Sequence, residues 1–199
     1  MKVIIVGATG TIGKAVCNEL EQRHTIISVG RSTGDFQVDI REPKSIEKLY
    51  QSIGPFDALV STTGEVHFGA LTEFTQEQYA IGLNSKLMGQ VNLILIGLKY
   101  INPHGSFTLT SGILSHDPIR FGSSASMVNG AINSYVKSAA IEMPNYVRIN
   151  AVSPTVIAES LDDYAPYFRG FEAVTAQRAA LAYSKSVEGA QTGVIYSVE

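Results

Sequence analysis

The sequence is poor in cysteine and in charged residues, and it contains no tryptophan. Cys17 is the only cysteine in 199 residues, which excludes an internal disulfide framework and a cluster of thiolate metal ligands. Cys17 falls within a predicted helix, where we expect it to be a small buried hydrophobe. We therefore predict no metal centre.

Basic blocks and long apolar runs are also missing. The net charge is −3, which argues against nucleic acid as a main partner. The longest apolar stretch, residues 91–98, is broken by Asn92 and Gly97 and is too short to span a bilayer. A predicted strand starts directly after residue 1, so we expect no signal peptide and a cytoplasmic protein without a membrane partner.

A glycine-rich turn stands at the start of the chain. Val3–Val6 form an unbroken apolar run, typical of a strand buried on both faces. Gly7, Gly10 and Gly13 follow at three-residue steps, and a helical pattern begins beside them. Such a unit presents backbone N–H groups and a helix N-terminus to a phosphate, and its glycines let a pyrophosphate approach. The turn therefore predicts nucleotide binding, the alternative being a plain βα turn.

Strands and helices alternate along the chain. The predicted strands are 2–6, 25–29, 36–38, 57–61, 105–110, 147–152 and 193–198. The predicted helices are 11–23, 43–53, a long one from Thr72 or Thr75 to about residue 101, 123–143 and 175–188. This alternation predicts an α/β Rossmann fold: a single domain over residues 1–199, with a doubly wound parallel sheet of about seven strands and helices on both faces. Ligands of such sheets bind at the carboxyl ends of the strands.

The loops at those strand ends suit a dinucleotide. Arg31 and Ser32 follow the second strand, and a guanidinium beside a hydroxyl suits a 2′-phosphate, so we expect NADP(H) rather than NAD(H). The alternative is a solvated surface arginine. Asp39 could accept from the adenine amino group while Ile40 packs on the ring, and the small residues 61–64 leave space for a ribose.

Together these motifs resemble the short-chain dehydrogenase/reductase family over nearly the whole chain. The glycine turn at 7–13, Asp39, Gly64 and the segment 148–154 match family motifs, with Thr155 in place of a glycine. The resemblance implies NAD(P)-dependent oxidoreductase ancestry and a set of cofactor-binding residues. That set comprises Gly7, Thr9, Gly10, Thr11, Ile12, Gly13, Arg31, Ser32, Asp39, Ile40, Ser61, Thr62, Gly64, Asn129, Pro154 and Val156.

The catalytic pair of this family is missing. The family places a substrate-binding serine after the fifth strand and Tyr-x-x-x-Lys on the next helix, where the tyrosine transfers the proton. Aligned on that pattern, Ala125 takes the tyrosine position and Asn129 the lysine position. Gly112 takes the serine position, with Ser111 as the candidate if the loop shifts by one residue. Asn84 matches the asparagine of the family's water relay, or has a structural role. The candidate catalytic residues are therefore Ser111, Asn84 and Asn129.

Other side chains could replace the missing proton donor. His67 follows the fourth strand and His116 the fifth, and a histidine exchanges protons near neutral pH. The alternative is that both are solvated loop residues. Tyr164 and Tyr167 lie in the segment that covers the substrate in this family.

Small residues follow one another at helical spacing on the long helix and on the next one. In related proteins these two helices form a dimer interface, so the resemblance implies a homodimer or homotetramer through helices 75–101 and 124–143.

Two functions are compatible with this pattern. One is an NADP(H)-binding oxidoreductase of the short-chain type that acts on a small carbonyl or alcohol with a non-standard active site. The other is a catalytically silent NADP-binding sensor or scaffold. Isomerase or lyase chemistry without net redox is a third possibility on this fold. The sequence does not identify the substrate.

Overall fold

The computed structural model describes residues 1–199. Its seven strands form one parallel sheet in the order β3-β2-β1-β4-β5-β6-β7, which confirms the predicted doubly wound arrangement. The strands are β1 Lys2–Val6, β2 Thr25–Gly30, β3 Phe36–Gln37, β4 Phe56–Ser61, β5 Ile101–Thr110, β6 Arg148–Pro154 and β7 Ile195–Val198. The order reverses between β1 and β4, and a crevice opens at that point, beyond the carboxyl ends of the strands.

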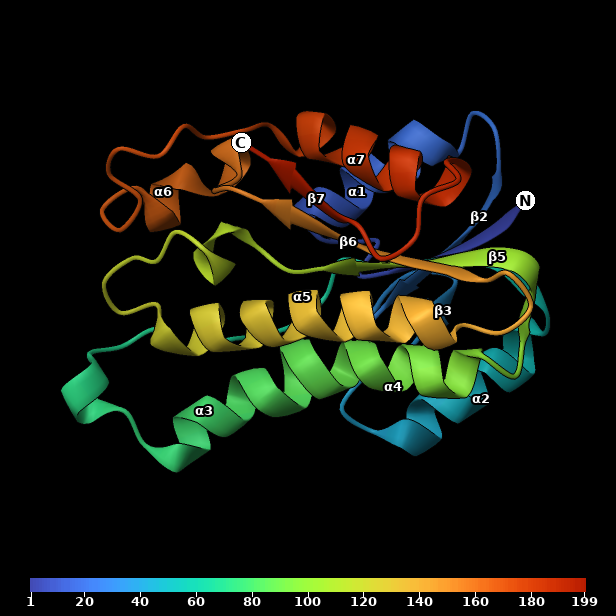
Figure 1. The fold of residues 1–199 in the computed structure, drawn as a ribbon, viewed down its shortest axis with the longest axis horizontal. Coiled ribbons are helices and arrows are strands. Elements are labelled where there is room, and N and C mark those ends of the chain that lie inside the picture. The colour runs from blue at the N-terminus through green and yellow to red at the C-terminus, as the bar shows by residue number, and fades with distance from the viewer.

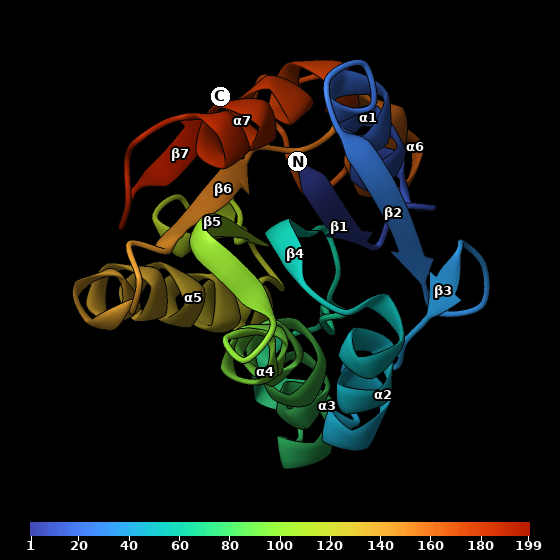
Figure 2. The same ribbon diagram turned by 90° about the vertical axis from the view of Figure 1, so that its right-hand side faces the viewer.

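Helices cover both faces of the sheet (Figures 1 and 2). One face carries α1 (Thr11–Leu20) and α7 (Ala176–Glu188). The other carries α2 (Pro43–Ile53), α3 (Gln76–Gly82), α4 (Met88–Gly97) and α5 (Ser123–Glu142). The short α6 (Leu161–Tyr164) was not predicted. None of the helices combines the length and the apolar character needed to cross a lipid bilayer.

Strand β1 shows why the sheet needs both layers. Val3 and Ile5 belong to the hydrophobic cluster shared with α1 and α7, whereas Ile4 and Val6 belong to the cluster on the opposite face. All four side chains are buried, since successive residues of a strand point to opposite faces. The unbroken apolar run is therefore required by burial on both sides.

The long predicted helix differs from the structure. It is divided into α3 and α4 by a π-helical turn at Leu83–Leu87, and it ends at Gly97 instead of near residue 101, where β5 begins. Thr75 is the N-cap, and its side chain accepts from the backbone N–H of Gln78 at 3.3 Å. A π turn holds one extra residue, so it rotates everything after it relative to α3.

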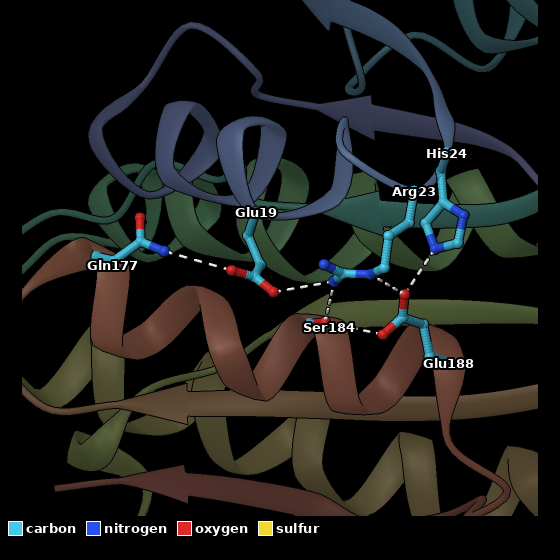
Figure 3. Close-up of polar contacts among 6 residues, drawn as sticks. All are labelled: Glu19, Arg23, His24, Gln177, Ser184 and Glu188. Carbon is cyan, nitrogen blue, oxygen red and sulfur yellow. Dashed lines mark hydrogen bonds and ion pairs between the residues drawn. The ribbon is translucent and has the colours of Figure 1, made fainter.

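Arg23 joins the end of α1 to α7 (Figure 3). The predicted helix over 11–23 stops at Leu20, which leaves Arg23 in the following turn. Its guanidinium donates to Glu188 Oε1 at 2.7 Å, to Glu19 Oε1 at 2.9 Å and to Ser184 Oγ at 3.0 Å. Glu188 also bonds His24 Nε2 at 2.8 Å and accepts from Ser184 Oγ at 3.1 Å. The hydrogen bond from Arg23, followed by those from His24 and Ser184, holds the pKa of the Glu188 carboxyl below its ordinary value.

Candidate active site

The glycine turn connects β1 to α1 with very little space. Gly7 adopts a φ of +89°, and a Cβ on Gly13 would lie 2.0 Å from the carbonyl oxygen of Gly7. A Cβ on Gly10 would meet the same oxygen at 3.4 Å, an ordinary contact. Glycine is thus required at positions 7 and 13 by the backbone conformation and by the backbone contact. At position 10 glycine is required only if a ligand approaches the start of α1.

A first cavity of about 250 Å³ lies beyond the ends of β1, β2 and β4. Its lining includes eight residues of the predicted cofactor set: Gly7, Thr9, Gly10, Arg31, Asp39, Ile40, Thr62 and Gly64. The structure therefore brings together loops that are far apart in the sequence. The shape suits an elongated, charged ligand whose phosphate lies at the helix N-terminus.

Two arginines border this cavity. Arg31 Nη1 lies 3.1 Å from Glu65 Oε1, and Arg41 donates to both carboxylate oxygens of Asp39, at 2.9 Å and 2.6 Å. The hydrogen bonds from Arg41 lower the pKa of Asp39 to about 2. The sequence analysis missed Arg41 and Glu65, although each stands within two residues of a predicted site residue. The cavity therefore has two guanidinium groups at its border, each paired with a carboxylate.

A second cavity of about 240 Å³ lies beyond the ends of β5 and β6. Much of its wall is apolar, with Phe68, Ile113, Leu114, Val156, Ile157 and Phe168 among the lining residues. Polar side chains interrupt that wall, among them Lys86, Ser111, Asn129 and Thr155. An apolar pocket with a few convergent polar groups is the usual form of a small-molecule site.

Three of these polar side chains have no partner within the protein. Ser111 Oγ, Asn129 Oδ1 and Thr155 Oγ1 are buried and accept or donate no hydrogen bond. Each of the three residues is at most 5% exposed. A buried, unpaired polar atom costs about 1–3 kcal/mol, so three of them on one wall indicate a site built for a polar ligand.

The loop after β5 explains which hydroxyl faces that cavity. A Cβ at position 112 would lie 2.9 Å from Asn129 Nδ2, so a serine at the aligned position would displace Asn129. Ser111 supplies the hydroxyl instead, while its backbone N–H donates to the carbonyl of Val152 at 2.9 Å. Ala125 is buried in a small apolar cluster and offers no proton.

Lys86 is a site residue that the sequence analysis missed. Asn84, a predicted catalytic residue, lies exposed in the π turn and lines neither cavity. Ser85 lines the first cavity and Lys86 the second. Burial lowers the pKa of Lys86 to about 8. The only signal in the sequence is that Lys86 is the one charged residue between Glu77 and Lys99.

The remaining predicted cofactor residues lie in other places. Ile12, Asn129, Pro154 and Val156 line the second cavity instead of the first. Thr11 and Ser32 are exposed and line neither cavity, while Gly13 and Ser61 are buried beneath the glycine turn and β4.

Of the candidate proton donors in the loops, His67, His116 and Tyr167 line neither cavity. His67 packs edge-on against Phe74, and the exposed His116 pairs with Glu199 at 3.2 Å. Tyr164 lines the second cavity, whereas Tyr167 packs against Phe121. No three His, Cys, Asp or Glu side chains are grouped in a way that could hold a metal ion.

Comparison with known proteins agrees with this geometry. A family model described as Enoyl-(Acyl carrier protein) reductase, of the short-chain type, matches residues 3–194. The chain belongs to the short-chain dehydrogenase/reductase family. Within this family it is similar to the protein lin1944 of Listeria innocua, whose crystal structure has 51% identity and a TM-score of 0.99, with 100% of both chains covered.

Two further proteins show more distant similarity. A small-chain dehydrogenase crystallised in complex with NADPH has 26% identity and a TM-score of 0.89, over 100% of this chain and 96% of that one. The uncharacterized oxidoreductase YmfI of Bacillus subtilis is 28% identical over 180 residues, which are 77% of this chain and 74% of YmfI.

Proposed function

We propose that the protein is an NADP(H)-dependent oxidoreductase that acts on a small carbonyl or alcohol through a non-standard active site. The observation that carries the proposal is the pair of unpartnered buried atoms, Ser111 Oγ and Asn129 Oδ1, in an apolar cavity next to the nucleotide crevice. Ser85 lines the first cavity and its neighbour Lys86 lines the second. A ligand that fills the first cavity therefore ends at the second cavity.

The first cavity has the residues that NADP(H) requires. The glycine turn would hold the pyrophosphate, and Arg31 and Arg41 would hold the 2′-phosphate. Ile40 would pack on the adenine and Asn129 would bond the nicotinamide ribose. A related dehydrogenase that binds NADPH supports this choice of cofactor. When bound, the nicotinamide supplies or accepts a hydride.

The chain's own residues would then position the substrate. Ser111 Oγ would donate to the substrate oxygen, and apolar side chains such as Phe68 and Phe168 would exclude water from the reacting carbon. The second cavity, at about 240 Å³, limits the substrate to a small molecule. Residues 1–199 would act as one cofactor-binding domain.

A titration of the purified protein with NADPH and NADH, followed by an NADPH-consumption assay over a panel of aldehydes and ketones, tests the proposal. We expect tighter binding of NADPH and turnover of at least one small carbonyl compound. Equal affinity for both nucleotides would contradict the assignment of Arg31 and Arg41, and absence of NADPH binding would overturn the proposed function.

A second candidate is a catalytically silent NADP-binding sensor. The observation that favours it is Ala125, whose methyl group packs with Ile113 and Leu114 where the family has its tyrosine. Tight NADPH binding without turnover of any compound in the panel would favour the sensor.

We also propose a homo-oligomer through α3–α4 and α5. Several large apolar side chains of these helices are exposed in the single chain: Ile81, Leu83, Met88, Leu95 and Met127. Their burial against a second copy would remove a large apolar surface from water.

A further inference from the structure

We propose that Lys86 is the catalytic acid of this site, and that its ammonium donates the proton to the substrate oxygen held by Ser111. It would do so in place of the tyrosine that α5 lacks. The inference rests on the proposed function, because it needs a carbonyl substrate in the second cavity and a nicotinamide beside it.

The backbone fixes the stem of Lys86 at the border of the two cavities. Gly64 adopts a φ of +124°, and a Cβ there would lie 2.6–2.7 Å from Cα, Cβ and Cγ of Lys86. The carbonyl oxygen of Lys86 accepts from Gln90 Nε2 at 2.9 Å, and the same amide donates to the carbonyl of Thr110 at 2.9 Å. Gln90, which is fully buried, thereby ties the π turn to the end of β5, directly before Ser111.

The ammonium of Lys86 has no counter-ion. None of the six ion pairs in the chain involves Lys86. The oxygen atoms on its cavity wall, Ser111 Oγ and Asn129 Oδ1, are without partners, so neither is bonded to Lys86. A cavity-lining lysine whose ammonium has no partner in the protein is available to a ligand.

The surroundings also set the proton affinity of Lys86. Tyr164 is the only other titratable side chain on the cavity wall, and Glu65, next to Gly64, pairs with Arg31 instead. Burial alone lowers the pKa of Lys86 to about 8, about two units below that of an ordinary lysine. At pH 7 the amine is still mostly protonated, yet it releases its proton far more readily than a surface lysine, which suits a general acid.

Asn129 avoids a second positive charge beside Lys86. The family's lysine on α5 would stand at position 129, and two ammonium groups on one small wall would repel each other. An asparagine there keeps a hydrogen-bonding group and removes the charge. The lysine of the site is thus supplied by the π turn instead of α5.

In the proton transfer, the N–H bond at Lys86 Nζ breaks and its electron pair stays on nitrogen, while an O–H bond forms on the former carbonyl oxygen. The carbonyl carbon is reduced by the hydride that NADPH supplies, so NADPH is the species oxidised. A water proton then restores the ammonium, and the reverse sequence oxidises an alcohol.

The test compares K86M, K86R and the control K99M, which removes an exposed lysine from the turn after α4. Lysine side-chain NMR over pH 6–12 should show one signal with a midpoint near 8 that is absent from K86M. With the carbonyl compound that the wild type reduces fastest, K86M and K86R should each lose about 100-fold or more in kcat. Their dissociation constants for NADPH and their melting temperatures should stay close to those of the wild type, and K99M should match it throughout.

K86R separates acid catalysis from a charge effect, because arginine keeps the positive charge but gives up no proton near neutral pH. Full activity of K86R, or a kcat of K86M within threefold of the wild type, would overturn the inference. So would a Lys86 midpoint above pH 10 in a protein that reduces carbonyl compounds. Absence of NADPH binding by the wild type would remove the proposed function as well, which distinguishes the two failures.

Discussion

Arg31 and Glu65 meet across the mouth of the first cavity, with Arg31 Nη1 3.1 Å from Glu65 Oε1. Both side chains are more than half exposed, so the pair stabilises the fold very little. Its consequence concerns the proposed NADP(H) binding, because Glu65 would compete with a 2′-phosphate for the same guanidinium.

Replacing Glu65 should therefore raise the affinity for NADPH, and replacing Arg31 should lower it. We expect Glu65→Gln to tighten NADPH binding by about threefold to tenfold, since Arg31 is then free. Arg31→Ala should weaken it by about tenfold or more and leave NADH unchanged. Calorimetric titration measures both, with Arg178→Ala on α7 as the matched control. Equal effects on NADPH and NADH would contradict the role of Arg31.

Gly10 and Gly13 should respond differently to the same added methyl group. Gly13→Ala places Cβ 2.0 Å from a backbone oxygen that cannot move aside, so we expect a loss of about 3 kcal/mol in the free energy of unfolding. Gly10→Ala makes only an ordinary 3.4 Å contact and should leave stability within about 0.5 kcal/mol. Its methyl group should nevertheless weaken NADPH binding about tenfold, because Gly10 lines the cavity. Urea unfolding and nucleotide titration separate the two effects.

Ser111→Ala should lower kcat by about 100-fold without destabilising the protein. The hydroxyl has no partner to lose, so its removal is neutral or slightly stabilising. Ser106→Ala is the matched control, because Ser106 Oγ is also buried and unpartnered but lines neither cavity. A loss of activity in both variants would show that Ser111 has no specific role.

The contribution of Glu188 to stability should disappear in acid. Its pKa is lower in the folded state than in the unfolded state, so the stabilisation is fully present above the unfolded pKa of about 4.3. It is lost as the pH falls through the folded pKa. Glu188→Gln should lower the melting temperature by about 1–3 °C at pH 7 and by nothing measurable at pH 3. Glu142→Gln, which removes an exposed carboxylate without an ion pair, should have no effect at either pH.

Leu95→Glu should break the proposed oligomer. Leu95 is 54% exposed on α4, and a charge there would be buried against the second copy. Sedimentation at micromolar concentration should show an oligomer for the wild type and a monomer for the variant. Leu181→Glu on α7 is a control of similar exposure on the opposite face, and it should remain oligomeric. A strictly monomeric wild type would refute the prediction.

The fold was predictable because its signals are local. The apolar run of β1 and the Thr75 cap each depend on a few neighbouring residues, and each is present in the structure. The nucleotide crevice followed from the same logic, since Arg31 and Asp39 directly follow strands. The pairing of Arg41 with Asp39 was missed because it depends on how the loop after β3 folds back.

Lys86 could not be placed from sequence for a different reason. The π turn does not follow from helix propensity or from the apolar pattern of residues 76–97, which reads as one continuous helix. Buried polar contacts fix it instead: Ser85 Oγ accepts from the backbone N–H of Glu65 at 3.0 Å, and Gln90 bonds the end of β5. These partners are about 20 residues away in the chain, so only the tertiary structure shows which residue faces which cavity.

The same π turn contributes neighbouring residues to the two cavities, Ser85 to the first and Lys86 to the second. Ser85 Oγ accepts from the backbone N–H of Glu65, whose carboxylate pairs with Arg31, and Lys86 is the next residue. A single peptide bond therefore separates the residue in contact with the nucleotide loop from the one that faces the substrate. A substitution that disturbs this turn, such as Ser85→Ala, would therefore displace the lining of both cavities at once.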